Sequence, residues 1–158
     1  MLLAAAGWLD AAGLGPWARG SGLVYPVANS FHLLGLVMLI GGIGVVDLRI
    51  AGLWRNLPIE ALSRAVTPVA VTGLAVMAAS GVVLFAADGR SLAGSGIFRT
   101  KLVLIALALA NAAAFRWRWG HRLGGWSREA PVSARAMAIV SILLWLAAGT
   151  LGRWIAYV

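Results

Sequence analysis

Apolar residues fill four long stretches of this chain, and short segments between them carry most of the charges. Because an α-helix rises about 1.5 Å per residue, roughly 20 such residues cover the roughly 30 Å hydrocarbon core of a bilayer. We predict four membrane-spanning helices, over about residues 23–46, 66–87, 102–119 and 136–158. The pattern therefore predicts an all-α fold, an integral membrane four-helix bundle that forms a single transmembrane domain over residues 1–158.

The segments between the stretches carry turn and loop signals. Asp88-Gly89-Arg90 predicts a turn after the second span, and Gly94-Ser95-Gly96 continues it as a loop. Residues 1–20 are apolar but are interrupted by glycine and proline, so they predict a short N-terminal interfacial helix anchored by Trp8 and Trp17. No basic segment precedes this stretch, and we therefore do not expect a cleaved signal peptide.

Composition supports a membrane location. The chain is 61% hydrophobic and 11% charged, whereas soluble domains carry about 25% charged residues. So few polar residues cannot cover the surface of a soluble core of this size, and lipid removes that need. The absence of cysteine excludes disulfides, thiolate metal sites and cysteine nucleophiles.

The formal net charge of +8 points to lipid headgroups, because most of the arginines flank the apolar stretches. The first and third connections hold eight of them: Arg49, Arg55, Arg64, Arg116, Arg118, Arg122, Arg128 and Arg135. The opposite side holds five basic residues: Arg19, Arg90, Arg99, Lys101 and Arg153. The positive-inside rule then predicts that both termini lie outside the cytoplasm, and we expect no nucleic-acid binding.

His32 is the most informative residue for function. It lies nine positions after Leu23, about 13 Å into the first helix, where an ionisable side chain is costly and marks a candidate functional site. One hypothesis is that it binds haem, quinone or a metal; the other is that it stays neutral and hydrogen-bonds to a neighbouring helix. His121 follows the third span on the opposite side, too far in depth to be a second ligand of the same haem, and we expect it to be solvated.

Three cations share the outer half of the predicted bundle with His32. Arg99 and Lys101 begin the third span, and Arg153 lies near the end of the fourth. They are candidates for binding haem propionates, a quinone carbonyl or an anionic lipid, and the alternative is that they extend to lipid headgroups.

Further polar residues predict structural contacts. Asp47 and Arg49 close the first span, where they are expected to form a clamp with Arg64 or Glu60. Asn111 lies inside the third span and should form an interhelical hydrogen bond. No Ser–His–Asp arrangement, Walker loop or Rossmann fingerprint occurs, so we expect no self-contained catalytic activity.

Short motifs resemble an uncharacterised family of small four-helix bacterial inner-membrane proteins. They are Ser30-Phe31-His32-Leu33-Leu34-Gly35, Asp47-Leu48-Arg49 and Gly152-Arg153-Trp154-Ile155-Ala156-Tyr157. A looser likeness extends to CopD-type copper-resistance proteins and to four-helix haem b membrane proteins. The resemblance implies a multi-pass protein of the bacterial inner membrane.

These observations favour a small subunit of a larger membrane complex that transfers electrons through haem b or quinone near His32. Two other functions stay open. One is a ligand-free structural or assembly subunit, and the other is a CopD-like metal-handling protein with His32 as a metal ligand.

Overall fold

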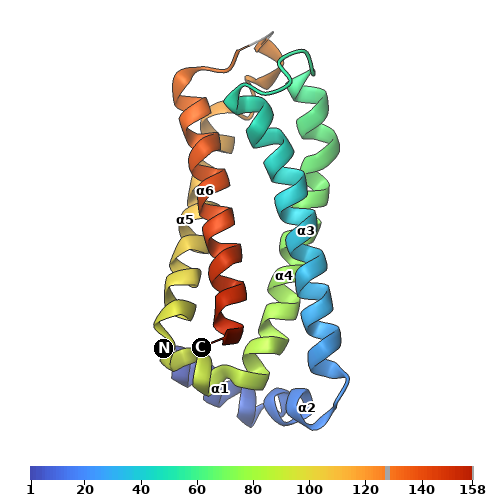
Figure 1. Cartoon of the computed structure of the whole chain (residues 1–158), viewed down its shortest axis with the longest axis vertical. Helices are drawn as coiled ribbons and strands as arrows, with labels where there is room; N and C mark the ends of the chain where they lie inside the picture. The colour runs from blue at the N-terminus through green and yellow to red at the C-terminus, as the bar shows by residue number, and fades with distance from the viewer. Residues whose placement is uncertain (127–128, 158) are drawn as a thin grey trace.

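The computed structural model describes residues 1–126 and 129–157, with only the backbone of Ala156. These residues form helices and connecting segments, and none of them forms a strand. Four long helices run side by side; the loops within the first and second pairs lie at one end, and the second helix passes to the third at the other end, near the N-terminus and the last turns of the chain (Figure 1). We call these the loop end and the terminal end. The predicted all-α, four-helix fold is confirmed.

The N-terminal segment forms two short helices across the terminal end (Figure 1). They are α1 (Leu2–Ala11) and α2 (Leu14–Gly20). Gly13 separates them with φ of 82°, a conformation that glycine adopts without steric cost. Both helices pack on α4, and α2 also contacts α3. The predicted short interfacial helix is therefore present, divided in two.

The first long helix, α3 (Val24–Ala51), ends at Gly52, whose φ is 122°. The second, α4 (Ile59–Gly94), follows Pro58 and is longer than the predicted span at both ends. The turn predicted at Asp88-Gly89-Arg90 corresponds to a break in the helix at Asp88, and a further helical segment follows it to Gly94. Asp88 leaves helical geometry, at φ −119° and ψ 19°, and produces a kink instead of an end.

The second hairpin contains α5 (Gly96–Trp119) and α6 (Val132–Trp154). Ser95 caps α5, because its hydroxyl accepts a hydrogen bond from the Phe98 N–H at 3.3 Å. A 3-10 turn, η1 (Leu123–Gly125), lies in the connection, and another, η2 (Ile155–Tyr157), follows α6. The helix starts within the loop predicted at residues 94–96, so the interruption there is a single residue.

The bundle is built from two hairpins, α3–α4 and α5–α6, which meet mainly where α3 packs on α6. Two apolar clusters fill the interior. The cluster near the loop end contains Val46, Ile50, Ile59, Trp119, Ala134 and Ala138. The middle cluster contains Leu39, Ala70, Met77, Ala108 and Trp145. Trp119 is 8% exposed and belongs to the first of these clusters.

Polar contacts at the loop end differ from the predicted clamp. Glu60 pairs with Arg64 at 2.6 Å on α4, and Asp47 hydrogen-bonds to Ser141 of α6. Arg49 is buried and donates to the carbonyl oxygens of Leu57 and Arg55, each at 2.8 Å. The expected Asp47 clamp with Arg64 or Glu60 is therefore wrong, because each of the two charged residues of α3 has its own partners.

The two loops are also tied to each other. Arg55 pairs with Glu129 at 2.5 Å, and the guanidinium of Arg135 donates to the Ala51 carbonyl oxygen at 3.3 Å. Arg128, one of the eight basic residues assigned to this side, lies outside the described residues. This ion pair and this hydrogen bond connect the loop ends of the two hairpins.

Candidate functional site

The candidate site is centred on His32, which lies partly buried on α3. Its ring Nδ1 is 3.0 Å from the hydroxyl oxygen of Ser80 on α4. The Ser80 hydroxyl has one proton, which it donates to the Val76 carbonyl oxygen at 2.6 Å. The Ser80 oxygen can therefore accept from His32, so we assign the ring proton to Nδ1.

This assignment leaves Nε2 with a free electron pair. The ring also forms a hydrogen bond with the backbone of Met77 on α4, while Nδ1 makes the Ser80 contact. A histidine whose Nδ1–H is held by an oxygen presents Nε2 as a proton acceptor or a metal ligand. The α4 backbone fits the ring closely, since a Cβ built on Gly81 would lie 3.3 Å from the ring Cε1 of His32.

Lys101 of α5 brings a positive charge to the same region. Its side chain is partly buried and lies over Gly152 of α6, where an added Cβ would be 3.0 Å from Nζ. The ammonium is close enough for its charge to act on the His32 ring. None of the ion pairs among the described residues includes Lys101. A histidine of one hairpin and a lysine of the other thus lie partly buried in the same terminal half of the bundle.

The other two predicted site residues lie on the surface. Arg99 donates to the carbonyl oxygens of Ser95 and Gly94, at 3.4 and 3.3 Å. Arg153 donates to the Tyr157 hydroxyl, and its guanidinium carbon lies 4.8 Å from the centre of that ring. Among the four predicted site residues, the structure places His32 and Lys101 in partly buried positions and leaves Arg99 and Arg153 exposed.

Ser80 and Gly81 are the contacts that the sequence did not reveal. Both lie on the predicted second span, but which of its residues face His32 depends on the register between α3 and α4. In the structure, Gly35 of α3 contacts Gly73 of α4, and this close approach sets the register. The available signal was a small polar residue followed by glycine inside the second span, and it is a weak one.

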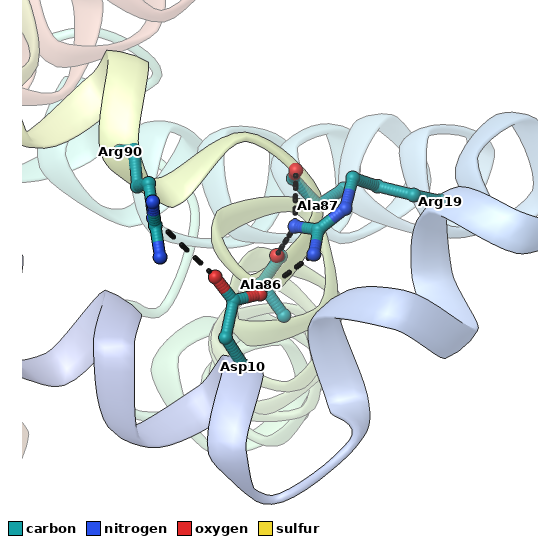
Figure 2. Close-up of polar contacts among 5 residues, drawn as sticks. All are labelled: Asp10, Arg19, Ala86, Ala87 and Arg90. Atoms are coloured by element: carbon teal, nitrogen blue, oxygen red, sulfur yellow. Dashed lines mark hydrogen bonds and ion pairs between the residues drawn. The ribbon is translucent and has the colours of Figure 1, made fainter.

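A second polar cluster joins the N-terminal helices to the kink in α4 (Figure 2). Arg19 donates to the carbonyl oxygens of Ala86 and Ala87, both at 3.2 Å, and to the Asp10 carboxylate at 2.8 Å. Arg90 lies 3.5 Å from the other oxygen of the same carboxylate. A half-open cavity of about 220 Å³ lies between these residues.

The Arg19 cluster has a structural explanation. A kink at Asp88 interrupts the helical hydrogen bonds, so the carbonyl groups just before it need other donors. Arg19 supplies them, and Asp10 neutralises its charge. We therefore assign the cluster to holding the fold rather than to binding a ligand.

Other predicted polar residues have clear positions. Asn111 donates to the Met137 carbonyl oxygen on α6 at 3.0 Å, which confirms the predicted interhelical hydrogen bond. His121 is exposed in the connection after α5, as expected. No group of three or more His, Cys, Asp or Glu side chains that could hold a metal ion occurs in the part of the chain that the structure describes. A metal bound at His32 would thus need ligands of another kind or from a partner.

Among the residues that the structure describes, four helices are long and apolar enough to cross a bilayer. Together with the bundle, they define a multi-pass α-helical membrane protein. The chain belongs to DUF6644, a family of unknown function whose model matches residues 6–158. This finding confirms the resemblance to an uncharacterised family. Comparisons with curated proteins and with solved structures find no match.

Proposed function

We propose that this protein is a small integral subunit of a larger membrane complex and carries electrons through a ligand bound between His32 and Lys101. The observation that supports this proposal is that His32 on α3 and Lys101 on α5 both lie partly buried in the terminal half of the bundle, and no ion pair of the described residues includes Lys101. Unpaired polar groups inside a membrane bundle are costly, and they commonly mark a ligand site or a pathway. The two hairpins each contribute one of the groups.

A quinone is the ligand that this pair fits best. A quinone carbonyl is an acceptor, and the Lys101 ammonium is a donor. After reduction the quinol hydroxyl is a donor, and Nε2 of His32 is an acceptor. The site would therefore offer a hydrogen bond to each redox form of a bound quinone.

Haem b is the second candidate, and the Ser80 contact favours it. Histidines that ligate metals usually donate their other ring N–H to an oxygen, as His32 does to Ser80. With His121 exposed in a loop, the second axial position would be open or filled by a partner. Lys101 would then pair with a haem propionate.

The proposed setting is a bacterial inner membrane with the loop end in the cytoplasm. The positive-inside rule supports this orientation, since the loop end carries more arginine than the terminal end. Single cysteines at Arg118 and Arg99, labelled in intact cells by a reagent that does not cross the membrane, test it. Labelling at residue 99 and protection at residue 118 are expected; the reverse pattern would contradict the orientation.

Purification in a mild detergent tests the ligand. We expect either an absorption spectrum with a Soret band, which identifies haem, or a quinone recovered by solvent extraction at close to one per chain. The variants His32→Ala and Lys101→Met should lose the ligand, while the matched variant His121→Ala should keep it. Isolation of the native protein with its partners tests the proposed membership of a complex.

The outcomes separate the remaining functions. A folded protein that holds no haem, iron or quinone would overturn the electron-transfer proposal and favour a ligand-free structural or assembly subunit. Copper or another metal recovered with the protein and lost in His32→Ala would favour the CopD-like metal-handling function.

A further inference from the structure

Asp47 is a buried acidic residue that the proposed site does not use, and it lies in the half of α3 nearer the loop end. Its side chain is 6% exposed. Ser141 of α6, itself 3% exposed, provides a hydrogen bond, and the carboxyl Oδ2 has no partner among the described residues. The middle cluster, which includes Leu39, separates this position from His32 along the bundle.

The cations around Asp47 interact elsewhere. On α3, Arg49 donates to the Leu57 and Arg55 carbonyl oxygens, and on α6 Arg135 donates to Ala51. On α4, Arg64 pairs with Glu60, and Arg116 and Arg118 of α5 are exposed. None of the ion pairs within the described ranges includes Asp47.

A carboxyl group in this position has three possible states. An ionised carboxylate without a cation is very costly in an apolar interior. A bound metal ion would require several oxygen ligands, but the contact described for Asp47 is the single hydroxyl of Ser141. A bound proton requires no further ligand, because it removes the charge itself.

We propose that Asp47 is a proton-binding site, occupied at neutral pH, and that its charge state controls the packing of α3 on α6. The neutral acid accepts the Ser141 hydrogen bond and lies beside the loop-end cluster of Val46, Ile50 and Ala138. Loss of the proton creates a carboxylate in this contact, which is the main one between the two hairpins. Packing is therefore firm at low pH and weakens as the pH rises through the point at which Asp47 ionises.

Infrared spectroscopy of the full chain in phosphatidylcholine vesicles tests the bound proton. The wild type should show the C=O stretch of a neutral carboxylic acid at neutral pH, and alkaline buffer should remove it. Asp47→Asn, which keeps the shape without an ionisable group, should lack the band, and the exposed-site control Asp88→Asn should retain it. If wild type and Asp47→Asn show the same spectrum in this region at neutral pH, Asp47 is ionised and the proposal is wrong.

Two measurements keep the test independent of how well Asp47→Asn folds. Ser141→Ala should shift the acid band to higher frequency, because the carbonyl loses a hydrogen bond; an unshifted band would place the bound proton on another residue. The melting temperature of the wild type should fall as the pH rises, and that of Asp47→Asn should stay level. Parallel pH profiles for the two proteins would overturn the control of packing. None of these readouts depends on a ligand at His32.

Discussion

The two hairpins of the bundle are held together by different means. In α3–α4 the helix backbones approach closely at glycines, and a Cβ built on Gly73 would lie 2.6 Å from the Gly35 carbonyl oxygen. In α5–α6 larger side chains fill the contact, with Trp145 and Ala108 in the middle cluster. Within the apolar stretches, 39% of α3 is buried in the protein but only 6% of α5.

The contrast separates two roles for apolar residues in this membrane protein. The glycines of α3–α4 specify a contact, because small residues let two helices pack closely where lipid supplies no hydrophobic driving force. Most apolar side chains of α5 are not buried in the protein and face the lipid around the bundle. Residue size is therefore strictly limited at the α3–α4 contact, whereas most positions of α5 tolerate side chains of different size.

The largest expected effect comes from breaking the close contact with Gly73→Val. The new side chain would clash with the Gly35 carbonyl oxygen and with the Leu39 amide nitrogen, 2.7 Å from the added Cβ. Overpacking typically costs about 1–3 kcal/mol, and more where backbone is the obstacle. We expect the upper end or beyond, measured by thermal unfolding in detergent.

Gly41→Val is the matched control for this prediction. Gly41 also lies in a membrane-spanning helix, but nothing is within 4 Å of a Cβ added there. It should unfold close to the wild type. Equal losses for the two variants would show that helix propensity, rather than the α3–α4 contact, accounts for the effect of Gly73→Val.

A smaller effect is expected in the second hairpin from Asn111→Ala, which removes the hydrogen bond to the Met137 carbonyl oxygen. Interhelical hydrogen bonds in membranes average about 0.6 kcal/mol. A shift of this order in the unfolding free energy should be measured in detergent or bicelles. Asn29→Ala is the control, since Asn29 is exposed on α3; a loss as large there would mean that the Asn111 bond adds nothing.

The smallest effect should come from Leu107→Ala on the lipid-facing surface of α5, where Leu107 is 51% exposed. Surface substitutions usually change stability by less than about 0.5 kcal/mol, and lipid fills the vacated volume without leaving a cavity. Thermal unfolding in bicelles should show no clear shift. A loss as large as that of Gly73→Val would indicate that another chain packs on α5.

The sequence predicted the four helices because each has an apolar stretch long enough to span a bilayer. It did not predict how far α4 extends, since residues 59–65 and 89–94 are mixed in polarity and still helical, the second segment lying beyond the kink at Asp88. His32 was identified by depth alone. Ser80 was not, because the register of two helices depends on contacts between them, and a single sequence does not contain that pairing.

The guanidinium of Arg19 restrains the kink at Asp88. It holds the carbonyl oxygens that the bend releases, and the Tyr25 side chain of α3 hydrogen-bonds to Asp88 itself. A displacement of the N-terminal helices would therefore be transmitted directly into the tilt of the last turns of α4. Those turns lead through Ser95 into α5, the helix that carries Lys101.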